Sequence, residues 1–420
     1  MKTKNRWLMA LSAIAIHLSI GAAYAYSVYK NPLVETIGWS ETYVTLAFTI
    51  MMALAGLSAA FFGPFVEKHG PRKSAILAAI LFASGQAGSG LAVVVDSSIM
   101  FLLTYGLLSG LGLGVGYISP VSTLVKWFPD RRGLATGMAV LGFGTGALVT
   151  APAAALLIET INVTNTFYVL GACYFILMML GASYIEPPKE GWMPPSMVKA
   201  VASGQKAIKK DLRQLTAKQA VKTKHFWMLW TMKLINVSAG IMMISVASPM
   251  AQDVVGLSAA AAATMVGIMG IFNGGGRLGW AAASDYIGRH NVFLIFFVIQ
   301  MVAFFTLPMT TNAIIFQILI LLVVSCYGGG FSNLPAFIGD LFGTKQLGAI
   351  HGYLLTTWSL GGIIGPMLVS NIQGATGSYI PVFYVFFGMI TLAFIVSVFL
   401  RMDIKKIQKQ QKLQQGSSIA

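Results

Sequence analysis

The sequence predicts an all-α membrane protein in which twelve membrane-spanning helices form two six-helix repeats. Three observations predict this fold class: an apolar composition, a series of long apolar runs, and a weak internal repeat. Hydrophobic residues make up 56% of the 420 residues and charged residues only 10%, whereas a soluble domain carries about 25% charged residues. A globule of this size cannot bury so much apolar surface, so lipid must surround most of it.

Twelve apolar runs are long enough to cross a bilayer, which takes about 20 residues of α-helix. Short polar segments separate them, and each run is read as one helix. The predicted spans are 7–29, 43–66, 74–95, 99–127, 133–159, 166–185, 225–251, 259–284, 292–308, 313–343, 347–373 and 380–400.

The basic residues indicate how these helices are oriented. Most of the 28 Lys and Arg fall in segments that share one side of the membrane when both termini are cytoplasmic, as the inside-positive rule requires. The formal net charge of +15 therefore reports topology and gives no support to nucleic-acid binding. We expect a multi-pass membrane protein with both termini in the cytoplasm and membrane lipid around it.

One long polar segment divides the spans six plus six. It contains four prolines and then a Lys-rich run that is typical of an amphipathic helix on the membrane surface. The predicted organisation is an N-terminal six-helix half at 1–185, a cytoplasmic linker loop at 186–224, a C-terminal six-helix half at 225–400 and a cytoplasmic tail at 401–420.

The two halves match each other weakly. Three pairs of residues have the same separation along the chain, and a fourth pair has nearly the same one. These pairs are Pro120 and Pro335, Gly133 and Gly348, Gly137 and Gly352, and Gly70 and Gly288. The offset indicates duplication of a six-helix unit, an architecture found in transporters whose substrate site lies at the membrane midplane.

The loops around the fourth pair carry a family resemblance. The loop between the second and third spans reads Gly63-Pro-Phe-Val-Glu67-Lys68-His-Gly70-Pro-Arg72-Lys73, and its echo between the eighth and ninth spans reads Asp285-Tyr-Ile-Gly288-Arg289. With the helix count and the central loop, these motifs resemble the major facilitator superfamily over the whole chain.

The same loops predict a gating role for four residues. An acid at one helix end and basic residues one turn away can bridge neighbouring helices when the cytoplasmic side is closed. We therefore expect Glu67, Arg72, Asp285 and Arg289 to act in gating. The alternative is that these basic residues serve topology alone.

Charged residues inside spans are costly and mark functional sites. All 13 acids fall in loops or at helix ends, whereas two cations, Arg277 and Lys233, lie within predicted spans. Asn273 is one turn from Arg277 on the same helix face. We expect an anionic substrate at Arg277, because a guanidinium binds a carboxylate bidentately. The alternative is an arginine that snorkels to the inner membrane surface. Lys233 is close to a helix end, and we expect its amine to snorkel to the membrane surface.

Aromatic residues and one histidine complete the candidate site. The aromatic residues predicted to line the cavity include Tyr24, Tyr117, Tyr327, Phe331 and Trp358, although single aromatics are more often packing or interface residues. His17 lies near the middle of the first span and is a candidate proton relay. The alternative is a hydrogen-bonded core histidine.

A narrower resemblance rests on several motifs together. The segments are Phe272-Asn273-Gly274-Gly275-Gly276-Arg277, Tyr24-Ala-Tyr26-Ser-Val-Tyr29, Trp127-Phe-Pro-Asp-Arg131-Arg132-Gly133-Leu-Ala-Thr-Gly137 and Phe226-Trp227-Met-Leu-Trp230. They resemble the oxalate/formate antiporter family, which includes bacterial monocarboxylate carriers. By this resemblance Arg277 is the substrate carboxylate ligand, and Tyr117 contributes to the pocket. The resemblance to bacterial members also implies the bacterial inner (plasma) membrane as the location.

One departure from that family bears on the substrate. Oxalate-handling members carry a lysine on the eleventh helix, where this chain has Trp358, and no Lys or Arg lies between Lys345 and Arg401. One arginine balances one negative charge, so we expect a monocarboxylate such as lactate, pyruvate or formate in place of oxalate.

The predicted function is secondary active, proton-coupled transport of a small monocarboxylate by alternating access. The alternatives are a carboxylate/carboxylate antiporter of the oxalate/formate type and a carboxylate-binding membrane sensor. We expect no enzymatic activity, cofactor or metal, because the sequence has no metal cluster, no nucleophile–base pairing and no phosphate-binding loop. The protein is expected to be monomeric.

Overall fold

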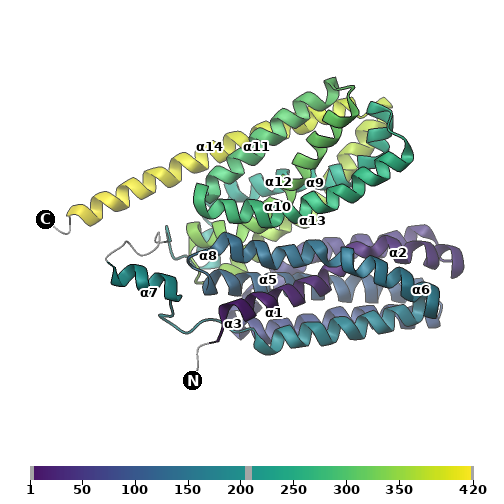
Figure 1. The fold of residues 1–420 in the computed structure, drawn as a ribbon, viewed down its shortest axis with the longest axis horizontal. Helices are drawn as coiled ribbons and strands as arrows, with labels where there is room; N and C mark the ends of the chain where they lie inside the picture. The colour runs from purple at the N-terminus through teal and green to yellow at the C-terminus, as the bar shows by residue number, and fades with distance from the viewer. Residues whose placement is uncertain (1–3, 204–210, 418–420) are drawn as a thin grey trace. The chain divides into compact units, whose positions relative to one another are not determined.

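The protein is all-helical, as the sequence predicts. The computed structural model describes residues 4–203 and 211–417, and every regular element in these ranges is a helix (Figure 1). Each of the twelve predicted spans falls on helical chain to within one residue. The prediction of an all-α fold is therefore confirmed.

The chain divides into two compact units. Unit 1 contains Met1–Ile208 and Gly348–Ser359, and unit 2 contains Lys209–Leu347 and Leu360–Ala420. The halves, linker and tail predicted from the sequence stay a prediction.

Unit 1 contains the helices that correspond to the first six predicted spans, and also a short helix that follows them. These helices are α1 (Arg6–Gly21), η1 (Ala22–Ala25), α2 (Tyr26–Asn31), η2 (Pro32–Thr36), α3 (Glu41–Val94), α4 (Ser98–Phe101), η3 (Leu102–Leu108), α5 (Ser109–Trp127), α6 (Arg132–Tyr184) and α7 (Pro195–Ala202).

Two of these helices, α3 and α6, each contain two predicted spans. α3 is interrupted at Gly70, which has φ +80°, a conformation that glycine adopts without steric cost. Pro71 follows and suits the first turn of the next helix. α6 is interrupted at Asn162, whose side chain accepts a hydrogen bond of 3.0 Å from the Asn165 backbone N–H, as a helix N-cap does.

Unit 2 contains the remaining long helices. They are α8 (Ala217–Val221), α9 (Lys224–Val255), α10 (Ala259–Ile287), α11 (Arg289–Thr306), η4 (Leu307–Met309), α12 (Ala313–Phe342), α13 (Leu347–Thr376), whose first part belongs to unit 1, and α14 (Ile380–Ser417). α14 continues well past the last predicted span at 380–400 (Figure 1).

The surface of these helices is apolar where a soluble protein would be polar. On α6, for example, Leu148, Leu156 and Leu180 are each more than half exposed. Within the described residues, nine helical runs are long and apolar enough to cross a membrane, with the two spans of α3 and of α6 each counted as one run. Helices satisfy their own backbone groups, so they are suited to lipid.

Candidate functional site

The two intramembrane cations are both buried inside unit 2. Arg277, on α10, is 1% exposed and Lys233, on α9, is fully buried. The Arg277 Nε donates a hydrogen bond of 3.1 Å to Asn273 Oδ1. This contact has the i, i+4 spacing that the sequence predicts, and it fixes the orientation of the guanidinium group.

Lys233 does not snorkel, so that prediction is wrong. Its Nζ is buried and meets no hydrogen-bond acceptor among the residues that the structure describes. The ammonium group lies 3.3 Å from the ring centre of Phe331, on α12. The side chain therefore points at a neighbouring helix and not along α9 toward the helix end. The direction of the Lys233 side chain depends on how α9 packs against α12. The prediction used only the distance of Lys233 from the end of α9, which gives no information about that packing.

One aromatic ring is shared by both cations. The Arg277 Cζ lies 5.5 Å from the ring centre of Phe331, the same ring that Lys233 contacts. Such contacts with an aromatic ring attract cations, by about 2 kcal/mol when they are desolvated. Tyr327 is one turn away on α12, and its ring centre lies 5.2 Å from that of Phe331. Thus Arg277, Asn273, Tyr327 and Phe331, four of the predicted binding residues, lie together in unit 2.

Glycines allow the three helices of this group to approach one another. A side chain at Gly328 on α12 would collide with the backbone oxygen of Asn273, and one at Gly330 would collide with Asn236 Oδ1 on α9. On α10, a side chain at Gly276 would collide with the backbone of Ser325. The glycine runs beside Arg277 and Phe331 therefore set the close packing of α10, α9 and α12.

Sequence reasoning missed Lys233 and Asn236 as site residues. Asn236 is fully buried, and its Oδ1 has no hydrogen-bond partner within the described ranges. The sequence did contain a pattern that could have identified them. Lys233 and Asn236 lie one turn apart on α9, as Asn273 and Arg277 do on α10. The two residue pairs lie in the same packed group, so it contains two buried cations. The count of one cation, from which the sequence predicted a monocarboxylate in place of oxalate, is therefore wrong.

The other predicted binding residues form an aromatic cluster in unit 1. The ring centre of Tyr117 lies 5.3 Å from that of Phe143 and 5.5 Å from that of Trp358. Tyr24 also packs on Phe143, at 5.2 Å between ring centres. A single pocket lined by residues of both units stays a prediction.

His17 belongs to the same cluster. It is fully buried, and its Nε2 lies 3.0 Å from the backbone oxygen of Tyr117. A carbonyl oxygen only accepts, so Nε2 carries a proton in this contact. The arrangement is that of a hydrogen-bonded core histidine, and the proton-relay role stays a prediction.

The predicted gating residues are held in different ways. In unit 1, Glu67 accepts a hydrogen bond of 2.6 Å from the backbone N–H of Gly348, and its carboxylate lies 3.6 Å from Lys126 Nζ on α5. Arg72 is exposed and forms no ion pair with any described residue. The Glu67 carboxylate therefore links α3 to α5 and to the start of α13 without Arg72.

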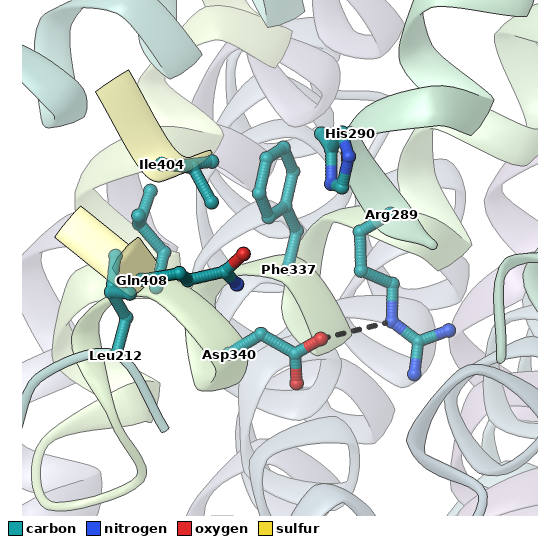
Figure 2. Close-up of a pocket in the computed structure, with 8 residues that line it drawn as sticks. Leu212, Arg289, His290, Phe337, Asp340, Ile404 and Gln408 are labelled. Atoms are coloured by element: carbon teal, nitrogen blue, oxygen red, sulfur yellow. Dashed lines mark ion pairs between the residues drawn. The ribbon is translucent and has the colours of Figure 1, made fainter. Parts of the chain in front are cut away.

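In unit 2, Arg289 pairs with two carboxylates. It donates to Asp285 Oδ1 and to Ser284 Oγ, and its Nε lies 3.4 Å from Asp340 Oδ2. Figure 2 shows this last ion pair at one side of a small pocket between α11, α12 and α14. Arg289 thus links the end of α10 to the end of α12, which agrees with a bridge between helices, and the gating role itself stays a prediction.

The fold and the buried charges define a multi-pass, all-helical membrane protein. The family model for the Major Facilitator Superfamily matches residues 10–366 and, again, residues 237–418. The chain belongs to this superfamily. It is therefore a membrane transporter and not an enzyme, as the sequence predicts.

Individual relatives agree with this assignment. The chain is 27% identical to the oxalate:formate antiporter of Oxalobacter formigenes over 403 residues, covering 93% of this chain and 92% of the relative. It is 23% identical to apicoplast pyruvate carrier 1 of Toxoplasma gondii, covering 68% of this chain and 61% of the relative. The predicted resemblance to oxalate/formate antiporters is confirmed.

Solved structures show the same fold. The crystal structure of the Major Facilitator Superfamily transporter FucP in the outward conformation matches with a TM-score of 0.73 at 14% identity. The match covers 93% of this chain and 98% of FucP. The superfamily fold, predicted from the loop motifs and the helix count, is confirmed.

Proposed function

We propose that this chain is a secondary active transporter of small carboxylates, with lactate, pyruvate and formate as the first candidates. Its substrate carboxylate binds Arg277, and the two six-helix repeats expose the site alternately to each side of the membrane. The proposed location is the bacterial inner membrane, with both termini in the cytoplasm.

The observation that carries this proposal is the buried guanidinium of Arg277. It is 1% exposed, and Asn273 on the next turn of α10 fixes its orientation. A buried cation is expensive in a membrane protein unless an anion compensates it. A carboxylate matches the planar fork of a guanidinium, with two parallel hydrogen bonds. An orientation fixed before the substrate arrives reduces the cost of binding.

The relatives support the class of substrate. One is named as an antiporter of oxalate and formate, and another as a carrier of pyruvate. All three compounds are small carboxylates with at most three carbons.

The coupling that we propose is symport of a monocarboxylate with one proton. Such transport is electroneutral and accumulates the substrate along the proton gradient. Exchange of two carboxylates is the alternative, and the name of the Oxalobacter relative favours it.

The experiment is uptake of radiolabelled lactate, pyruvate, formate and oxalate into proteoliposomes with an imposed inward proton gradient. Wild type is compared with Arg277→Gln and with Arg131→Gln, a matched control at an exposed arginine. We expect Arg277→Gln to reduce uptake by about a hundredfold or more, because a hydrogen-bonded ion pair with the substrate is lost. Arg131→Gln should transport normally.

The possible results of this uptake experiment distinguish symport, exchange and a sensor, and they test Arg277 as the carboxylate ligand. Uptake only into preloaded vesicles replaces symport by exchange, and binding without uptake indicates a sensor. Full activity in Arg277→Gln refutes Arg277 as the carboxylate ligand. The melting temperature is the control for folding of Arg277→Gln. We expect it to be at or above that of wild type, because the substitution removes a buried charge.

A further inference from the structure

Lys233 is a buried cation whose place in transport remains to be explained. It is fully buried on α9, and its Nζ meets no hydrogen-bond acceptor among the described residues. Its close neighbour is the ring of Phe331, at 3.3 Å from the ring centre. An aromatic face contributes about 2 kcal/mol, whereas removing an ammonium from water costs several kcal/mol. A further acceptor is needed for balance.

A second buried polar atom lies in the same small space. A methyl group placed on Gly330 would collide with Asn236 Oδ1 and would lie 3.5 Å from Lys233 Nζ. Both polar atoms therefore lie close to the same position beside Gly330, and the lack of a side chain at this glycine allows Asn236 to approach α12. Asn236 Oδ1 also has no hydrogen-bond partner in the described ranges. The Lys233 ammonium donates hydrogen bonds, and Asn236 Oδ1 accepts them.

A hydroxyl group can satisfy both atoms, because its oxygen accepts while its O–H donates. Arg277 approaches the same Phe331 ring as Lys233, so a short molecule can reach both cations. The planar fork of arginine suits the carboxylate, and the compact ammonium of lysine suits a single oxygen.

We propose that Lys233 is a second substrate-binding residue, which selects carboxylates with an oxygen on the carbon next to the carboxylate. The inference rests on the proposed function, since Arg277 is taken to hold the carboxylate. A 2-hydroxy acid satisfies Lys233 and Asn236 together. A 2-oxo acid satisfies Lys233, and a simple acid satisfies neither.

Lactate and propionate form the test pair, because they differ only by the 2-hydroxyl group. The measurement is the apparent affinity of each acid, from its competition with labelled lactate uptake in proteoliposomes. Wild type is compared with Lys233→Met, which keeps the length of the side chain, and with Lys73→Met, a matched control at an exposed lysine. A hydrogen bond to a charged group contributes enough to change affinity about ten- to a hundredfold.

We expect wild type and Lys73→Met to prefer lactate over propionate by about this factor, and Lys233→Met to lose the preference while it still binds propionate. Equal weakening of both acids in Lys233→Met would assign the lysine a structural or purely electrostatic role and overturn the proposal. An unchanged preference would overturn it too.

Different results would refute the proposed function and the proposed role of Lys233. If wild type takes up no carboxylate, or if Arg277→Gln transports normally, the carboxylate site itself is wrong. If Arg277→Gln abolishes uptake and Lys233→Met leaves the lactate preference intact, the carboxylate site stands and the role of Lys233 falls. Asn236→Ala supplies a second variant, which should weaken lactate more than pyruvate because only lactate has a hydroxyl group to donate.

Discussion

Two groups of buried cations in unit 2 differ in the side chains that surround them. Arg289, at the start of α11, is 7% exposed and pairs with Asp285 and Asp340. Lys233 and Arg277 are buried at least as deeply, and their contacts include an asparagine amide, which Arg277 meets, and the Phe331 ring, which both approach.

The difference indicates two uses of charge in one membrane protein. The Arg289 guanidinium is paired with carboxylates inside the protein and links the ends of α10 and α12, and its gating role stays a prediction. In the Lys233 and Arg277 group, the lysine amine meets no hydrogen-bond acceptor among the described residues, and under the proposed function a substrate anion supplies one. An arginine that already pairs with carboxylates, as Arg289 does, offers a substrate anion little additional binding energy.

The largest effect on stability should come from breaking the balanced group. Arg289→Gln leaves two carboxylates without their guanidinium, and we expect a loss of about 3 kcal/mol. The measurement is the thermal unfolding of the purified protein in detergent. A melting temperature equal to that of wild type would show that these ion pairs add nothing to stability.

The second largest effect on stability should come from disturbing the close packing of α10 against α12, which brings Arg277 near Phe331. Gly276→Ala places a methyl group against the Ser325 backbone, whereas Gly275→Ala points into open space among the described residues. We expect Gly276→Ala to cost about 2 kcal/mol by overpacking, and Gly275→Ala to be neutral or to stabilise by up to about 1 kcal/mol. The same unfolding measurement compares these neighbours, and equal effects would contradict the packing described here.

The smallest effect on stability should come from removing the unbalanced charge. Lys233→Met replaces a buried ammonium by an apolar side chain of similar length, so we expect a change within about 1 kcal/mol, in the stabilising direction. Thermal unfolding without substrate measures it. A strong destabilisation would mean that Lys233 is balanced inside the protein, as Arg289 is.

The sequence predicted the helices and four of the six residues of the proposed substrate group, namely Arg277, Asn273, Tyr327 and Phe331. Arg277 and Asn273 were found because their contact is local, with i, i+4 spacing on one helix. The breaks inside α3 and α6 fell between predicted spans, because glycine, proline and asparagine mark them in the sequence.

Lys233 and Glu67 show where the sequence was insufficient. The depth of Lys233 was judged from its distance to the helix end, but its direction depends on how α9 packs on α12. Glu67 was grouped with Arg72 because they are close in sequence, and the structure pairs Glu67 with Lys126 on another helix. Contacts between residues far apart along the chain cannot be read from helix periodicity.

The most direct test of the proposal that Arg277 holds the substrate carboxylate is calorimetric binding of lactate to the purified protein, without membrane or gradient. Wild type, Arg277→Gln and Arg131→Gln are titrated under the same conditions. The account predicts saturable binding to wild type and to Arg131→Gln, and none to a folded Arg277→Gln. Equal binding to all three would show that the carboxylate is held elsewhere and would contradict the account.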